Sequence, residues 1–244
     1  MKRKTANTIV REHGRYLWAG WALAGLALAV VTTGCSVTQR EAPVLQGGKC
    51  ALIPQNICAQ LEPGPKGGVG LRYIAPNVQW TQYTKVMVSP VTAWGGDTTK
   101  LSPADTQMLT NYLYKALLKA YETKFPVVNE PGPGVVRVSA AIVDANAATP
   151  GLRSVSMIVP QARVLGMLKL AATGTYPFVG AAQGELMLTD PVSGKVLAAA
   201  VDRRVGGGSI ETAAQWQWGD AENAMDKWAE LAVNRLVWLQ SGQP

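Results

Sequence analysis

Hydrophobic residues recur with helical spacing in two long stretches of the chain. In residues 102–124, apolar side chains fall three or four positions apart, while polar and charged ones take the opposite side. Ser102 and Pro103 mark the start, because serine caps a first helical turn and proline fits its first position. Residues 216–239 repeat the amphipathic pattern. The two predicted apolar stripes are Leu109, Leu113, Ala116, Leu117 and Ala120, and Ala221, Met225, Trp228, Ala232, Leu236 and Leu239.

Shorter stretches carry the pattern of β-strands. Residues 85–91 form a mostly apolar run typical of a buried strand, and residues 135–143 alternate between two faces. Residues 178–189 and 195–204 flank the segment 190–194, whose sequence Asp-Pro-Val-Ser-Gly is a strong turn signal. The last two runs therefore predict a β-hairpin.

Residues 152–176 have an ambiguous pattern. The part around residues 155–159 suits a strand, whereas residues 162–172 suit a helix. Its formal charges are all positive, which is typical of a segment on a membrane surface or in the groove of a partner. The alternative is a core element whose Lys and Arg stems reach solvent.

The order of these elements predicts the fold class. A strand, a long helix, a strand, the ambiguous segment, a hairpin and a second long helix follow one another without a repeated βαβ unit. We therefore expect a single α+β domain over residues 71–244, a largely antiparallel sheet with two long amphipathic helices on one face. Residues 35–70 are rich in Pro and Gly and predict a flexible tether after a lipidated N-terminus.

The first 35 residues have the parts of a secretory signal. Five Lys and Arg residues precede an apolar run over residues 17–31, which is short for a membrane span, and small residues lead to Cys35. This ending resembles the lipobox of bacterial lipoproteins, although Thr32 replaces the usual Leu. The resemblance implies removal of residues 1–34 and lipidation of Cys35. The alternative is an uncleaved signal anchor formed by residues 17–31.

Charge and histidine content exclude several classes of protein. The first 34 residues hold five of the 23 basic and one of the 16 acidic residues, so 18 basic and 15 acidic residues remain, a net charge of about +3. No basic cluster of the kind that binds nucleic acid survives. The only histidine, His13, lies in the signal. Its removal excludes catalytic triads that need histidine, and His-ligated metals.

Two cysteines remain beyond Cys35. Cys50 and Cys58 form an even pair, which outside the cytoplasm predicts a disulfide. Closing such a small loop is worth roughly 2.5 kcal/mol in the chain-entropy model. Free thiols are the alternative, and two thiols without further ligands do not complete a metal site.

Two groups of residues are candidate binding positions. On a strand, Asp202 and Arg204 share one face and Arg203 points to the other, so the two guanidinium groups can bind a carboxylate or phosphate. The alternative is an ion-pair ladder with acids such as Glu185 or Asp220. Trp216 and Trp218 precede the last helix, where they either stack on a ligand or anchor the helix to the core.

The acidic residues do not indicate catalysis. Glycan cleavage needs two carboxylates close together. Nothing in the sequence brings a pair of acids together, and most of the aspartates in question stand at turns or element ends. We therefore expect no enzyme activity, no cofactor and no metal. The aspartates considered are Asp144, Asp190, Asp202 and Asp220.

Several stretches resemble one uncharacterised bacterial lipoprotein family, known as domain of unknown function 3313. The resemblance covers roughly residues 70–240 and implies an envelope lipoprotein of Gram-negative bacteria, with no established reaction. Ser36 follows Cys35 where an Asp typically retains a lipoprotein in the inner membrane, so the resemblance implies the outer membrane, facing the periplasm. The stretches are residues 72–76 (RYIAP), 83–88 (YTKVMV), 101–105 (LSPAD), 128–135 (VNEPGPGV), 199–204 (AAVDRR) and 218–220 (WGD).

The sequence therefore predicts a non-enzymatic, lipid-anchored accessory or adaptor protein that binds other envelope proteins. The rival hypothesis is a periplasmic carrier of a hydrophobic or anionic small ligand. Such a carrier would use the apolar residues 155–172 together with Arg203 and Arg204.

Overall fold

The computed structural model describes residues 38–94, 101–148, 179–207 and 217–242. The chain divides into two compact units, Met1–Cys35 and Ser36–Pro244, and all described residues belong to the second. The predictions made for the signal, Cys35, Trp216 and residues 155–172 fall outside the described ranges. Within those ranges, no helix is long and apolar enough to cross a membrane.

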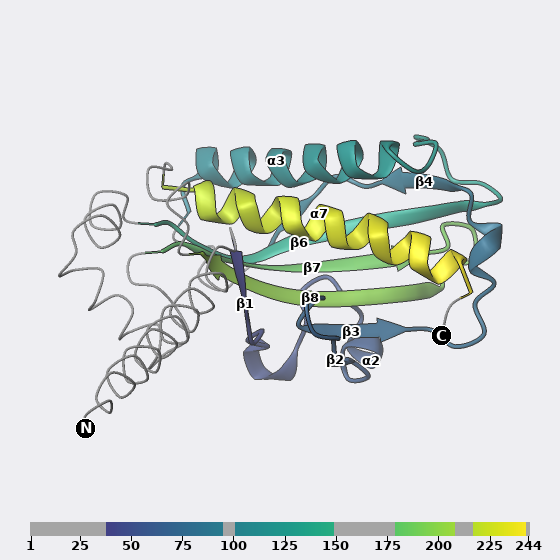
Figure 1. Ribbon diagram of the computed structural model, residues 1–244, viewed down its shortest axis with the longest axis horizontal. Helices are drawn as coiled ribbons and strands as arrows, with labels where there is room; N and C mark the ends of the chain where they lie inside the picture. Colours follow the sequence, from purple (N-terminus) through teal and green to yellow (C-terminus); the bar gives the residue numbers. More distant parts are fainter. Residues whose placement is uncertain (1–37, 95–100, 149–178, 208–216, 243–244) are drawn as a thin grey trace, which may run out of the picture. The chain divides into compact units, whose positions relative to one another are not determined.

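Eight strands of the described residues form one sheet, whose centre is an antiparallel meander (Figure 1). It consists of β6 (Val135–Asn146), β7 (Ala181–Thr189) and β8 (Val196–Gly206). Along the outer edge of β6 lie β4 (Lys85–Val88) and β5 (Thr92–Ala93), both parallel to it. The predicted hairpin is confirmed as the β7–β8 pair.

The outer edge of β8 is shared by two antiparallel strands. β3 (Leu71–Ile74) pairs with the first half of β8, and β1 (Thr38–Glu41) pairs with its end. The short strand β2 (Glu62–Pro63) then pairs with β3. A 3-10 turn, η3 (Trp80–Gln82), leads from this edge into β4 on the far side of the sheet.

Two long helices, α3 (Pro103–Glu122) and α7 (Gly219–Gln240), lie side by side against one face of the sheet (Figure 1). The side chain of Ser102 accepts a hydrogen bond from the backbone N–H of Asp105 at 3.1 Å, so the predicted cap is confirmed. Both predicted apolar stripes face the main core, and the single α+β domain with a mostly antiparallel sheet is confirmed. The most deeply buried helix side chains of this core are Leu109, Leu113, Leu117, Tyr121, Met225 and Leu236.

The segment predicted to be a tether is instead part of the domain. Beyond β1 it forms a 3-10 turn, η2 (Gln46–Gly48), and one short helical turn, α2 (Gln55–Cys58). Its apolar side chains pack on the sheet face opposite the two long helices, because alternate residues of β8 point to that side. The buried members of this second cluster are Ile53, Ile57, Cys58, Ala199 and Val201.

A buried carboxylate from the centre of the sheet holds this segment in place. Glu185 of β7 accepts hydrogen bonds from the backbone N–H groups of Ala51 and Leu52 at 2.8 Å and of Ile53 at 3.1 Å. Glu185 is only 3% exposed. Three donors for one carboxylate offset the cost of removing its charge from water.

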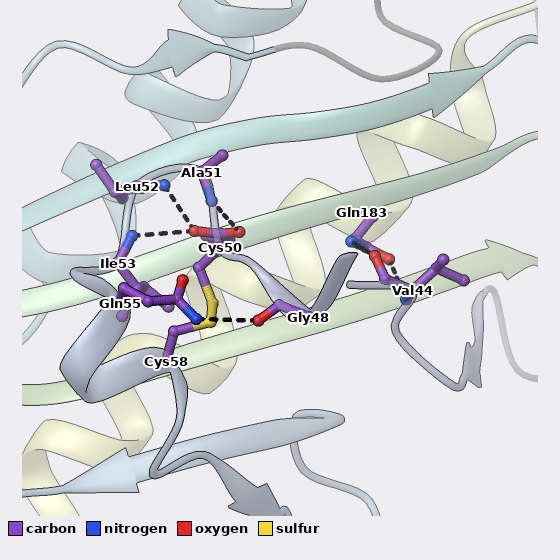
Figure 2. The surroundings of a disulfide bond; sticks show 10 residues. Val44, Gly48, Cys50, Ala51, Leu52, Ile53, Gln55, Cys58 and Gln183 are labelled. Atoms are coloured by element: carbon purple, nitrogen blue, oxygen red, sulfur yellow. Dashed lines mark hydrogen bonds between the residues drawn. A yellow bond between two sulfur atoms is a disulfide. The ribbon is translucent and has the colours of Figure 1, made fainter. Parts of the chain in front are cut away.

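Two further links fasten the same segment (Figure 2). The side chain of Gln183 accepts from the N–H of Val44 at 2.8 Å and donates to its carbonyl at 2.9 Å. The predicted disulfide between Cys50 and Cys58 is confirmed. Pro and Gly content correctly indicates the shortage of regular elements here, but it carries no information on partners more than a hundred residues away.

The three hydrogen bonds to Glu185 predict a strong effect of a nearly isosteric change. In Glu185→Gln an amide NH₂ group replaces one acceptor oxygen and leaves at least one backbone N–H of residues 51–53 unsatisfied. We expect the free energy of unfolding of Ser36–Pro244, measured in urea, to fall by about 1–3 kcal/mol. The matched control is Glu130→Gln at an exposed loop position, and equal stability of the two variants would contradict this account.

Candidate binding pocket

A cavity of about 330 Å³ lies between α7 and the sheet, beside β3. It exists because small side chains meet there: Gly184, Ala198 and Ala200 come from the sheet, and Ala232 comes from α7. Larger side chains at these positions would fill the space between the helix and the sheet. The cavity is therefore a consequence of side-chain size along two neighbouring strands and one helix face.

Trp228 of α7 forms one wall of the pocket. Its ring lies directly over Gly184, where an added Cβ atom would be 2.8 Å from the ring atom Cζ3. The indole N–H donates to Oδ2 of Asp202 at 3.0 Å. Glycine at 184 is required for this close approach, and the hydrogen bond fixes the orientation of the ring.

Asp202 is the pocket's buried carboxylate on the face that carries the helices. Besides Trp228, it accepts from Nε of Arg204 at 2.8 Å and from the backbone N–H of Gly70 at 2.8 Å. Burial raises the pKa of Asp202, while the charge of Arg204 and these hydrogen bonds oppose the rise. The carboxylate is thus matched by donors of its own chain and has no unbalanced charge to offer a ligand.

The rim differs from the floor in both exposure and charge. Floor residues such as Leu113, Ala140 and Leu188 are at most 3% exposed. At the rim, Arg72 and Arg235 are half-buried, and the turn before β3 contributes exposed residues such as Pro65. The pocket therefore opens to solvent between this turn and α7, and its mouth carries two guanidinium groups.

Among the described residues, Arg72 has one exposed carboxylate partner and Arg235 has none. Arg72 comes within 3.5 Å of Glu62, a largely exposed side chain, and its Nε is buried without a hydrogen-bond acceptor. Arg235 lies over the ring of Trp238, with its Cζ 4.0 Å from the ring centroid. Burial, and then the positive charge of Arg72, lower the pKa of Arg235. The mouth therefore carries positive charge that these partners only partly balance.

The cluster predicted at residues 202–204 does not form a free anion site. Arg203 points to the opposite face, as predicted, and its Nε and Nη1 pair with Glu41 and Asp144, both at 2.7 Å. Burial lowers the pKa of Arg203, but these bonds outweigh it and raise the pKa overall. Arg204 is paired with Asp202. The ion-pair alternative is therefore the one observed.

The ion pairs nevertheless involve other acids than those expected. Glu185 binds the backbone of residues 51–53, and Asp220 accepts the N–H of Gly180 at 2.7 Å. Both carboxylates serve buried backbone donors. Sequence alone did not show this, because the donors come from segments without a regular pattern.

Trp218 anchors a helix rather than forming a stacking platform. It is 5% exposed, belongs to the main core and stands at the N-cap position of α7. Its indole N–H donates to Oδ1 of Asp105 on α3 at 3.0 Å, which joins the starts of the two long helices. Within the described residues, no cluster of three or more His, Cys, Asp or Glu side chains is arranged to hold a metal ion.

The sequence interpretation missed the residues that form the pocket. Arg72 lies within the stretch RYIAP, and Arg235 lies on the predicted second helix, but nothing in either local pattern brings the two together. The run Ala198-Ala199-Ala200 opposite Gly184 is the one available signal, since such small residues in a buried hairpin are typical of a close approach or a gap.

Comparison with solved structures finds distant similarities. One is a PelC dodecamer from Paraburkholderia phytofirmans, with 10% identity and a TM-score of 0.36, covering 68% of this chain and 95% of that chain. Another is a Xanthomonas campestris protein of the DUF330 family, with 14% identity and a TM-score of 0.37, covering 69% of this chain and 94% of that chain. A third is a putative neuraminyllactose-binding hemagglutinin homolog from Helicobacter pylori, with 13% identity and a TM-score of 0.36, covering 69% of this chain and 94% of that chain. At these TM-scores the similarities support no functional statement about this chain.

The family comparison is more direct. No curated protein matches the sequence. A family model described as "Protein of unknown function (DUF3313)" matches residues 55–232, which is most of the described domain. The chain therefore belongs to the DUF3313 family.

Proposed function

We propose that this domain is a non-enzymatic binding protein that takes up the apolar part of a small ligand in the pocket between α7 and the sheet. The observation that carries the proposal is the apolar cavity of about 330 Å³, open at a polar rim. Ligand pockets have volumes of about 300–1,000 Å³ and are mostly apolar with few polar groups. The pocket is at the lower end of this range, so it suits one slender apolar group.

The energetics of such a ligand are favourable but modest. Burial of each methylene contributes about 0.8 kcal/mol. A chain of about ten buried methylenes would thus gain about 8 kcal/mol before the cost of ordering the ligand. Because the sheet and the helix form the pocket before the ligand binds, little of this free energy is lost to reorganising the protein. We expect dissociation constants in the micromolar range or weaker.

The carrier hypothesis has a stronger structural basis than the adaptor hypothesis. The described ranges contain only four exposed large apolar side chains, each on a different segment of the chain. Protein interfaces normally gather such residues. They are Val44, Trp94, Val192 and Val237. Binding to other envelope proteins remains part of the proposal, but as a route for delivering the ligand.

We further propose that Cys35 is lipidated and holds the domain on the outer membrane, facing the periplasm. The ending of the signal supports this, and so does the family resemblance. Since β1 begins at Thr38, only Ser36 and Val37 separate Cys35 from the sheet. Three residues span at most about 10 Å. A lipidated chain would therefore hold its sheet close to the lipid surface, without a long tether.

Filling the pocket should weaken binding. In Ala200→Leu the added carbon atoms occupy the cavity. We therefore expect the apparent affinity for N-phenylnaphthylamine, a neutral apolar probe whose fluorescence rises on binding, to fall at least about fivefold. Ala104→Leu adds the same atoms at an exposed position of α3 and should bind like the original domain. Equal binding by both variants, or no probe binding to the original domain, would overturn the carrier proposal.

Lipidation is tested by comparing the native protein with Cys35→Ala. We expect the native chain to lack residues 1–34, to carry acyl mass and to sediment with the outer membrane, whereas the variant keeps its signal and carries no acyl mass. Intact mass measurement and membrane fractionation provide both readouts. A full-length, unacylated native chain in the inner membrane would show that residues 17–31 are a signal anchor.

A further inference from the structure

We propose that the ligand is a single-chain amphiphile with an anionic head group, a carboxylate or a phosphate, held at the pocket mouth by Arg72 and Arg235. This inference rests on the proposed function, since it requires that the pocket bind an apolar chain. It adds the charge of the ligand and its orientation, with the chain inside and the head group at the rim.

The two arginines come from different elements and meet at the mouth. Arg72 is on β3, at the edge of the sheet, and Arg235 is on α7, which covers the sheet. Two guanidinium groups that face a common opening repel each other, and an anion between them would replace this repulsion with two attractions. Guanidinium groups also match the planar geometry of carboxylate and phosphate oxygens.

Arg235 is better prepared for a ligand than Arg72. Arg235 is held over the ring of Trp238, which limits the freedom that it would lose on binding. Nε of Arg72 is buried and lacks an acceptor among the described residues, although buried donors are normally satisfied. Because Nε is buried, a ligand at the mouth would contact the terminal nitrogens of Arg72 instead. Nη2 of Arg72 forms an ion pair with Glu62 at 3.5 Å, and because that carboxylate is largely exposed, a ligand at the mouth would compete with a weak partner.

The interior of the pocket determines the rest of the ligand. Asp202 is already matched by Arg204, Trp228 and Gly70, so a charged group placed deep in the pocket would find no free partner. Apolar side chains such as Leu186 and Leu188 line the remaining space. The volume of about 330 Å³ suits one chain rather than two. The charge of the ligand therefore belongs at the rim.

The test compares ligands with the same chain and different head groups. Dodecanoate, dodecyl phosphate, dodecanol and dodecylammonium compete with N-phenylnaphthylamine for the Ser36–Pro244 domain, which contains the whole sheet and both apolar clusters. We expect at least one anion to bind about tenfold or more tightly than dodecanol, and dodecylammonium to bind most weakly. The two anions distinguish a fatty acid from a phosphate-bearing lipid.

Variants at the mouth assign the effect to the two arginines. Arg72→Gln and Arg235→Gln should each reduce the preference for the anion over dodecanol at least about threefold, while the affinity for dodecanol stays the same. Lys119→Gln removes one positive charge from the exposed side of α3 and should keep the preference. Since Arg235 is half-buried on a helix surface, its variant should fold even if Arg72→Gln does not.

The possible failures are distinguishable. If dodecanol binds as tightly as the anions, the head-group inference is wrong and the carrier proposal stands. If Lys119→Gln lowers the preference as much as Arg235→Gln, the effect is one of overall charge and the inference is again wrong. If none of the four compounds displaces the probe, both the inference and the carrier proposal fail.

Discussion

The pocket depends most on the hydrogen bonds that the carboxylate of Asp202 accepts. Asp202 lies on the central strand β8 and accepts hydrogen bonds from Trp228 on α7, from Arg204 on its own strand and from the backbone of Gly70 before β3. Arg204 in turn reaches the carbonyl of Gly68 in the rim turn at 3.3 Å. One buried ion pair therefore fixes the helix, the sheet and the turn around the opening, and the small side chains beneath Trp228 leave the cavity unfilled.

The opposite face of the sheet follows the same principle with a different partner. Glu185 on β7 gathers the backbone donors of residues 51–53, and the disulfide between Cys50 and Cys58 closes the loop that presents them. Buried charges on both faces are thus used to attach irregular segments to a regular sheet. This arrangement accounts for a domain that begins at β1, three residues after Cys35, instead of after a long tether.

Periodic patterns predicted the parts of the fold that depend on periodicity. Local spacing predicted the two helices, the cap of α3 at Ser102, the β7–β8 hairpin and the antiparallel sheet. The disulfide was predicted because an even number of cysteines, two, remains beyond Cys35. The order of residues 38–70 could not be predicted in this way, because its partners Gln183 and Glu185 lie on a strand far along the chain. The pocket was missed for a related reason, because Arg72 and Arg235 come to line one pocket only when α7 packs on the face of the sheet. The conspicuous pair, Arg203 and Arg204, is occupied by Glu41, Asp144 and Asp202.

Native mass spectrometry tests most directly whether the pocket holds a lipid. It is applied to the Ser36–Pro244 domain, exported to the periplasm without Cys35 and purified without detergent. We expect a fraction of molecules to carry one additional mass, released on denaturation and identified as a single-chain anionic lipid. The same mass should be absent from Ala200→Leu. A domain that carries no such lipid, and that takes up none when dodecanoate or dodecyl phosphate is added, would contradict the central claim.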